Sequence, residues 1–360
     1  GDWSSDVCSS DLQKRNLMYY PAKKNIILRD YLKTLASFIK DCQLESGAII
    51  SNADGSLDPW DHCESIMGLS IMNQFDSALK GFDWLKETQN EDGSWYAKYD
   101  DQSVIEFHKP THFSSYITVA AFHYFLITND KDFLRSLWRV IEKAADFTLN
   151  HQIDDGSIYW AVDDKNNIDK DSLITGSSSI LKSLECGIAI SKILNKKNNW
   201  NNAYFKLKEC IRNSPSSFDK KKDRSNFSMD SYYPILCGAL DDKDLIDSAI
   251  SKTLKDFYVD GIGIKCVKNE PWVTVAETSE FIIALVKNDK EELAKKLFTE
   301  ILNISDFDNV PYMGWQYKEN IFWPDEKPSW TAAAVILAAD GIYDLSKGSS
   351  LFKNNFLDFC

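Results

Sequence analysis

The sequence predicts an all-α protein, an (α/α)6 toroid in which about twelve helices pair into six hairpins. Three observations lead to this fold class: helical periodicity along the chain, alternation of short and long connections, and a difference in composition between two sets of helices. No segment shows the alternating pattern of a long strand. Because no linker rich in glycine, serine and proline divides the chain, we treat it as one domain.

Apolar residues recur with a helical period throughout the chain. The periodic stretches are 27–42, 62–73, 76–89, 111–127, 131–151, 175–195, 199–213, 229–239, 241–256, 274–287, 289–304 and 329–344. No apolar run approaches the roughly 18–20 residues that a membrane-spanning helix needs, so we predict no membrane span.

Connections between these stretches alternate in length. Short links such as 73–74, 128–130, 241–242 and 288–289 force neighbouring helices to run antiparallel. The long connections are 43–61, 90–110, 152–174, 214–228, 257–273 and 305–328. If every second connection is long, all the long ones lie at one end of the helices, as in a closed array of hairpins.

Helices that follow a long connection are predicted to form an inner ring. Residues 114–122 (SSYITVAAF) and 330–340 (WTAAAVILAAD) are small and apolar nearly all round, whereas 130–147 carries a charged stripe. The inner helices then start at the face that holds the long loops. Their N-termini carry partial positive charge, so this mouth is expected to stabilise carboxylates.

The first residues need separate treatment. Asp2 to Leu12 reads DWSSDVCSSDL, which resembles the conceptual translation of a sequencing-adapter oligonucleotide. We therefore expect residues 1–12 to be foreign to the protein and residues 13–360 to form the toroid domain.

Charge and cysteine content limit the partners. A net charge of −13 would repel phosphates, so we predict no nucleic-acid partner. The cysteines form no CxxC motif, a pattern typical of reduced thiols in a cytoplasmic protein. We predict no cofactor and no metal. Two alternatives have little support in this pattern: a zinc site built from distant residues, and a metal held by Glu106, His108 and His112.

The segment 80–95, KGFDWLKETQNEDGSW, resembles the QW repeat of terpenoid cyclases and their prenyltransferase relatives. Weaker echoes occur at 43–47 and 152–157. In such a repeat the glutamine ends an outer helix, the Asp-Gly pair turns the chain, and the aromatic residue packs back. The motif therefore supports the fold and says nothing about a reaction.

The resemblance extends to the starts of four inner helices. Segments 58–69, 228–240, 271–280 and 329–340 look like those of a bacterial α/α-toroid group usually called prenyltransferase-like. That resemblance implies an enzyme with a substrate in the central cavity. Six-hairpin glycosidases share this architecture and also use DGSW-type turns, so fold alone leaves both families open.

Four carboxylates at the loop face are our candidates for acid–base catalysis. They are Asp61, Glu64, Asp230 and Glu277. Asp61 has an alternative role as an N-cap, with Glu64 completing a capping box, and Asp230 has an alternative role as a cap. The expected substrate-binding residues are mostly aromatic and crowd the same loops and helix starts. They are Trp60, His62, Trp95, Tyr232, Tyr233, Trp272, Trp315 and Trp330.

Aromatic walls with acids fit two kinds of small-molecule substrate. Aromatic faces stabilise carbocations, as isoprenoid chemistry needs, which favours a transferase or cyclase of the prenyltransferase-like type. Paired carboxylates also cleave glycosidic bonds, which favours a six-hairpin carbohydrate-active enzyme. The third alternative is a toroid without catalysis that binds a sugar or peptide.

Overall fold

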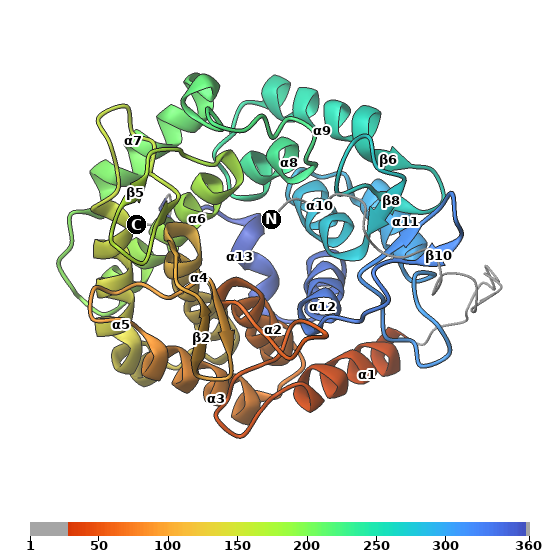
Figure 1. The fold of residues 1–360 in the computed structure, drawn as a ribbon, viewed down its shortest axis with the longest axis horizontal. Coiled ribbons are helices and arrows are strands. Elements are labelled where there is room, and N and C mark those ends of the chain that lie inside the picture. The colour runs from red at the N-terminus through yellow and green to blue at the C-terminus, as the bar shows by residue number, and fades with distance from the viewer. Residues whose placement is uncertain (1–27, 358–360) are drawn as a thin grey trace.

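The computed structural model describes residues 28–357, which form a closed ring of helices around a central axis (Figure 1). The predicted toroid of six hairpins is confirmed within this range. Residues 1–12, expected to be foreign, lie outside the described residues.

The first twelve helices alternate between the outer and inner layers. The outer helices are α1 (Leu28–Asp41), α3 (Phe75–Thr88), α5 (Lys131–Leu149), α7 (Trp200–Asn213), α9 (Lys243–Phe257) and α11 (Glu291–Ile301). The inner helices are α2 (Pro59–Ile71), α4 (Thr111–Thr128), α6 (Ile174–Ile193), α8 (Met229–Leu236), α10 (Val275–Lys287) and α12 (Ser329–Tyr343). A short helix, α13 (Ser350–Lys353), and two 3-10 turns, Pro215–Ser217 and Lys347–Ser349, complete the helical elements.

Each inner helix contacts the next one around the ring, and α12 contacts α2 to close it. The inner helices are buried on nearly all sides, as their small and apolar composition predicts. The outer helices bury one stripe and expose charged residues on the other side. Within residues 28–357, no helix combines the length and apolar character that crossing a membrane requires.

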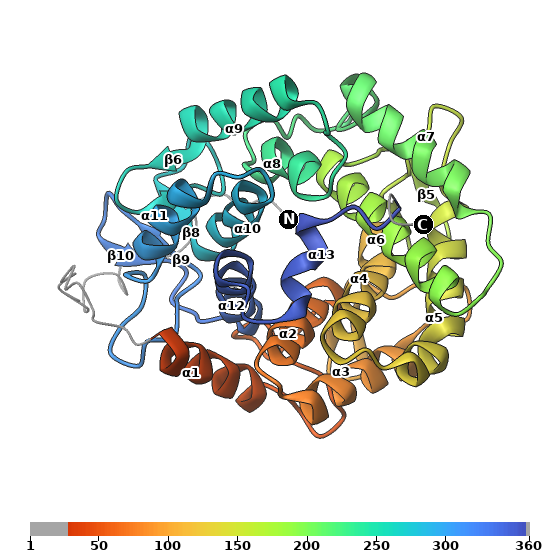
Figure 2. The same ribbon diagram turned by 180° about the vertical axis from the view of Figure 1, so that it is seen from behind.

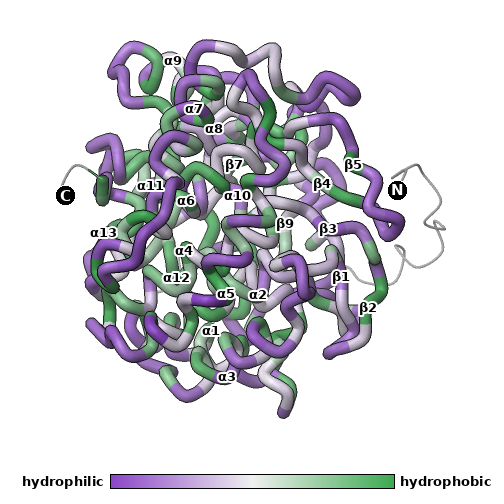
Figure 3. Tube along the Cα trace, turned by 90° about the vertical axis from the view of Figure 1, so that its left-hand side faces the viewer, coloured by the Kyte–Doolittle hydropathy of each residue, from purple (hydrophilic) through white to green (hydrophobic). Residues whose placement is uncertain are grey.

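The long connections lie at one face, and four of the six carry short antiparallel strands of two to four residues. The strands are β1 (Lys98–Asp100), β2 (Ser103–Glu106), β3 (Lys109–Pro110), β4 (Ala161–Val162), β5 (Ile168–Asp169), β6 (Tyr258–Val259), β7 (Gly263–Ile264), β8 (Trp272–Thr274), β9 (Gly314–Gln316) and β10 (Ile321–Phe322). They pair as β1–β2, β3–β4–β5, β6–β7 and β8–β9–β10. In the side view, β1 to β5 lie on the side opposite α13 (Figure 3).

The C-terminal segment closes the ring from the face of the short links (Figure 2). It is anchored by a fully buried ion pair on α6, Lys182 Nζ to Glu185 Oε1 at 2.7 Å. Lys182 also donates to the carbonyl of Asn354, and Glu185 accepts from the backbone N–H of Phe356. The sequence predicted the mouth at the face of the long loops but not that this segment would cover the opposite end of the ring.

The QW-type motif is a structural tie, as its physics predicts, and it recurs three times. In each copy the glutamine Nε2 donates both to the carbonyl of a glycine four residues later and to a carbonyl of the next outer helix. The ties are Gln43 to Gly47 and Ser77, Gln89 to Gly93 and Val140, and Gln152 to Gly156 and Ala203.

The glycine of each tie is required by geometry, and Gly93 gives a direct test. Gly93 has φ +93°, and a Cβ there would lie 2.1 Å from the carbonyl oxygen of Lys143. We expect Gly93→Ala to lower the free energy of unfolding by at least about 2 kcal/mol, because strain and overlap add. Urea denaturation measures this loss.

Gly55→Ala is the matched control. Gly55 also has a positive φ of +85°, but nothing lies within 4 Å of the added Cβ. Gly55→Ala should lower the free energy of unfolding by only about 1 kcal/mol, because it adds the strain of a positive φ without steric overlap. Equal losses in the two variants would contradict a packing role for the glycine of the tie.

Candidate active site

An open cavity of about 220 Å³ lies at the face of the long loops, where the inner helices begin. We call it the upper cavity. Its wall consists of Asp58, Trp60, Asp61, Glu64, His112, Phe113, Leu173, Thr175, Gly176, Arg224, Met229, Glu277, Glu280 and Trp330. Below it lies a second, much smaller space of about 20 Å³, the lower chamber, and the two share Glu64 and Glu280.

Position along an inner helix decides which space a residue lines. The second residue of α2, α4, α6 and α12 lines the upper cavity; these residues are Trp60, His112, Thr175 and Trp330. The sixth residue of five inner helices lines the lower chamber; these residues are Glu64, Tyr116, Ser179, Glu280 and Ala334. Because a helix turns once in 3.6 residues, the two sets lie about one turn apart on the same face.

Two inner helices carry carboxylates at equivalent places. Asp61 and Glu277 are the third residues of α2 and α10, and Glu64 and Glu280 are the sixth. All four line the upper cavity. The spacing of three residues puts both acids of each helix on the face towards the axis. The structure thus brings together three of the predicted acids and adds Glu280.

The N-cap of α2 is Asp58, so the predicted cap at Asp61 is wrong. Asp58 accepts from the backbone N–H of Asp61 at 2.9 Å, and Pro59 begins the helix. A proline is favourable at the first position, where no N–H partner is available, so the helix starts three residues earlier than predicted. Asp61 is thereby free of the capping role and points into the cavity wall.

Asp58 and Asp61 form a coupled acidic pair. Burial raises the pKa of Asp58 to about 6, although backbone N–H groups of Asp61 and Trp60 favour its ionised form. Burial and the neighbouring carboxylates of Asp58 and Glu64 raise the pKa of Asp61 well above its ordinary value. The Asp61 carboxyl hydrogen-bonds to Asp58, so the shared proton resides on Asp61.

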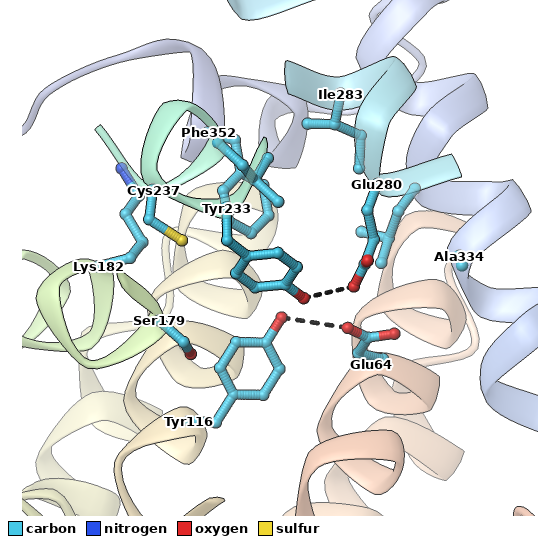
Figure 4. A pocket seen from close by; sticks show the side chains of 12 residues that line it. Glu64, Tyr116, Ser179, Lys182, Tyr233, Cys237, Glu280, Ile283, Ala334 and Phe352 are labelled. Atoms are coloured by element: carbon cyan, nitrogen blue, oxygen red, sulfur yellow. Dashed lines mark hydrogen bonds between the residues drawn. The ribbon is translucent and has the colours of Figure 1, made fainter. Parts of the chain in front are cut away.

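Two tyrosine–glutamate pairs lie side by side at the lower chamber, Tyr116 with Glu64 and Tyr233 with Glu280 (Figure 4). Glu64 accepts from Tyr116 Oη at 3.4 Å and from Trp60 Nε1 at 3.0 Å. Glu280 accepts from the hydroxyl groups of Tyr232 and Tyr233. Burial raises the pKa of Glu64 to about 8. Burial and the neighbouring acids raise that of Glu280 well above its ordinary range.

The aromatic part of the wall is built around Trp60. Its ring stacks on Tyr116 with centroids 4.4 Å apart and an interplanar angle of 13°. His112 and Phe113 lie 5.6 and 6.1 Å from it. With Trp330 on the neighbouring helix, the upper cavity thus has flat apolar surfaces beside its acids, an arrangement that suits the faces of sugar rings.

Asp230 lies behind the wall of the cavity. Its Oδ1 accepts from the hydroxyl of Thr175 at 2.5 Å, and its Oδ2 lies 3.6 Å from Nε of Arg224. Thr175 and Arg224 themselves line the upper cavity. The structure thus connects Asp230 to the site through its neighbours and separates it from Asp61 and Glu277.

Two of the predicted binding residues pack elsewhere. His62 lies between α2 and α3, where it accepts from Ile49 N–H at 3.2 Å and its Nε2 lies 3.0 Å from the carbonyl of Gly81. Trp95 is fully buried and donates to the carbonyl of Leu85 at 3.0 Å as part of a helix tie. The structure therefore places both residues in packing roles, since a helix start exposes only some of its side chains to the axis.

The remaining predicted aromatics divide between the core and the loops. Tyr232 and Tyr233 are buried on α8 and hold Glu280. Trp272 donates through Nε1 to the carbonyl of Trp323 at 2.6 Å in the sheet of β8–β10, where Trp315 packs on Phe322. Neither Trp272 nor Trp315 is among the residues that line the two spaces.

Four site residues were missed in the sequence: Asp58, Tyr116, Arg224 and Glu280. Glu280 had a usable signal, because Glu277 and Glu280 repeat the three-residue spacing of Asp61 and Glu64. Arg224 had none, since it lies in the long loop 214–228. Within residues 28–357, no group of three or more His, Cys, Asp or Glu side chains is arranged to hold a metal ion.

These features define a six-hairpin toroid with a sugar-sized, acid-lined cavity. The chain is 33% identical over 334 residues to MMP endo-(1,4)-3-O-methyl-alpha-D-mannosidase of Mycolicibacterium hassiacum, an alignment that covers 92% of each protein. The chain belongs to the family of this mannosidase. No protein-family model matches the chain.

Solved structures agree on the architecture. A wild-type glycosidase superposes with a TM-score of 0.69 at 14% identity, over 94% of this chain and 100% of that one. A D-mannose isomerase superposes with a TM-score of 0.69 at 10% identity, over 90% and 99%. At these identities the likeness shows the fold. Together with the family, it supports the six-hairpin glycosidase alternative better than the prenyltransferase hypothesis.

The raised pKa of Glu64 predicts a pH-dependent stability. Folding raises the pKa of this carboxyl to about 8. Its contribution to the free energy of unfolding is therefore full below about pH 4.5 and is lost as the pH rises through 8. Glu64→Gln cannot ionise. Between pH 5 and pH 8, we therefore expect the free energy of unfolding of the variant to rise relative to that of the wild type by on the order of 3 kcal/mol.

Chemical denaturation at the two pH values measures this difference. The control is Glu209→Gln on the exposed face of α7, which should follow the wild type at both pH values. If the free energies of unfolding of Glu64→Gln and the wild type change equally between pH 5 and pH 8, Glu64 does not hold a proton in the folded protein.

Proposed function

We propose that this protein is a glycoside hydrolase that cleaves α-mannosidic bonds in the upper cavity. The observation that carries the proposal is the placement of Asp61 and Glu277 at the same position of two inner helices, both facing one aromatic-lined cavity. Glycosidases use a pair of carboxyl groups flanking the scissile bond, one as acid and one as base or nucleophile. Membership of the mannosidase family supports the same chemistry.

Asp61 is our choice for the general acid. A general acid must hold its proton near neutral pH, and the pKa of Asp61 is raised by burial and by Asp58 and Glu64. Asp58 accepts the hydrogen bond from this carboxyl and so fixes its orientation. Protonation of the glycosidic oxygen by Asp61 lets the leaving sugar depart as an alcohol.

Glu277 is our choice for the second carboxylate. Burial raises the pKa of Cys266, and the neighbouring Glu277 raises it further, so this thiol stays protonated and donates to Glu277. This hydrogen bond holds the Glu277 carboxyl in the wall of the cavity, opposite the arc that carries His112. The carboxyl acts at the anomeric carbon, either by activating a water molecule or by direct attack.

The proposed substrate class is an α-(1,4)-linked mannoside, with or without O-methyl groups. The relative named above acts on a 3-O-methylated mannose polymer, and the present cavity suits uncharged sugar rings, because it pairs apolar surfaces of Trp60 and Trp330 with polar groups. Hydrolysis of such a polymer creates new reducing ends, and an assay for reducing sugar measures it.

Replacing either carboxyl group should abolish hydrolysis without unfolding the protein. We expect Asp61→Asn and Glu277→Gln each to lower kcat by about 10²–10⁴-fold, with thermal stability retained. Glu300→Gln, at a buried glutamate of the outer helix α11, is the control and should keep wild-type kcat. Full activity in Asp61→Asn or Glu277→Gln would remove that residue from the mechanism.

Leaving-group dependence tests the division of roles. An aryl mannoside with an acidic phenol needs little protonation, so Asp61→Asn should retain much more activity on it than on a natural oligosaccharide. Glu277→Gln should lose activity on both substrates. The reverse pattern would exchange the two roles, and the anomeric configuration of the first product decides whether Glu277 is a base or a nucleophile.

A further inference from the structure

The wall of the upper cavity is divided into two chemical halves. The carboxylates come from α2 and α10, which flank α12 in the ring. The opposite arc consists of α4, α6 and the loop before α8, and it contributes His112, Thr175 and Arg224. Among the described residues of the wall, Arg224 is the only lysine or arginine. A bound molecule would thus lie between an accepting half and a half that can donate.

The Arg224 guanidinium is held in place from behind. Its Nε lies 3.6 Å from Oδ2 of Asp230 and 4.0 Å from Oδ1 of Asp219, distances of ion pairs rather than of hydrogen bonds. The guanidinium lies over the ring of Phe227, 4.5 Å from its centroid. Asp230 is in turn fixed by the hydroxyl of Thr175. Charge and packing therefore orient Arg224 without satisfying its donors.

Two buried polar atoms of the wall, Nδ1 of His112 and Oε2 of Glu277, have no hydrogen-bond partner within the described residues. Nε of Arg224 also lacks a hydrogen bond, but it faces the unpaired oxygens Asp219 Oδ1 and Asp230 Oδ2 behind the wall. Buried polar atoms are nearly always paired in native proteins, so the two unpaired atoms on opposite sides of one cavity point to a bound molecule that pairs with them. Gly176 of α6 packs beside the His112 imidazole, since a Cβ at Gly176 would lie 3.2 Å from His112 Nδ1.

We propose that Arg224 and His112 form a clamp that binds ring oxygens of a mannosyl residue and holds its reacting bond against Asp61 and Glu277. This inference rests on the proposed function. Asp230, and Asp219 beside it, are positioning residues that orient the guanidinium. A guanidinium only donates, so it binds hydroxyl and ether oxygens alike, whereas an ionised carboxylate needs a hydroxyl that can donate. The clamp therefore accepts O-methylated sugars.

Burial is consistent with the role of His112 as a neutral hydrogen-bonding group. Burial, with the nearby charge of Arg224, lowers the pKa of His112 to about 3. The ring thus stays uncharged at neutral pH and offers one donor and one acceptor nitrogen. A neutral imidazole beside a guanidinium avoids repulsion between two cations on the same wall.

Calorimetric titration with an α-(1,4)-linked manno-oligosaccharide tests the clamp. We expect Arg224→Met to weaken binding by about tenfold to a hundredfold, since a hydrogen bond to a charged group is lost in a buried site. Arg224→Lys keeps the charge without the planar fork and should recover only part of the affinity. Unchanged affinity in a folded Arg224→Met protein would overturn the proposal.

Steady-state kinetics of Asp230→Asn test the positioning role. Loss of the charge behind Arg224 should raise KM several-fold while kcat stays within about twofold, because the reacting carboxyl groups are untouched. Asp223→Asn, at an exposed residue of the same loop, is the control with wild-type KM. If kcat instead collapses at unchanged KM, Asp230 acts on the reacting bond and the assignment is wrong.

The two proposals fail in different ways. If the wild-type protein hydrolyses no mannoside, the proposed function fails, yet the titration still decides whether Arg224 binds the sugar. If the wild type hydrolyses mannosides while Arg224→Met and Asp230→Asn keep wild-type affinity and KM, only the clamp fails.

Discussion

Close approach of the inner helices is the constraint on which the rest of the structure depends. The ring closes where α12 meets α2, and there a Cβ at Gly68 would lie 3.0 Å from Cβ of Ala333. Larger residues at such contacts would open the ring. Because closure brings six helix N-termini to one face, residues far apart in the chain meet around a single cavity.

Convergence of helix starts also explains why acids persist in the interior. The first turn of a helix offers unpaired N–H groups and partial positive charge, and Asp61 and Glu277 lie in this turn, at the third position of their helices. That benefit fades beyond the first turn. Glu64 and Glu280, at the sixth position, instead receive hydrogen bonds from tyrosine and tryptophan side chains. Those donors favour the ionised forms, but burial outweighs them and raises the pKa of both glutamates.

The fold could be predicted from the sequence because its signals are local and repeated. The alternation of loop lengths, the small inner helices and the copies of the glutamine–glycine tie each point to the ring. The short strands and the segment around α13 could not be predicted. Two-residue strands are too short for a periodic pattern, and the ion pair of Lys182 with Glu185 reads as an ordinary helical spacing. The site was predictable in part: Asp61, Glu64 and Glu277 lie together, whereas Arg224 depends on where a long loop folds.

The charge distribution of the cavity distinguishes between the two substrate classes that the sequence left open. A prenyl diphosphate brings several negative charges. In this cavity it would meet five acidic residues and a single arginine to offset them; the acids are Asp58, Asp61, Glu64, Glu277 and Glu280. An uncharged sugar meets no such repulsion. Its hydroxyl groups can donate to the acids and accept from Arg224, while its apolar face packs on Trp60 or Trp330. An aromatic wall alone fits either substrate; an aromatic wall whose polar groups are mostly acids favours the sugar.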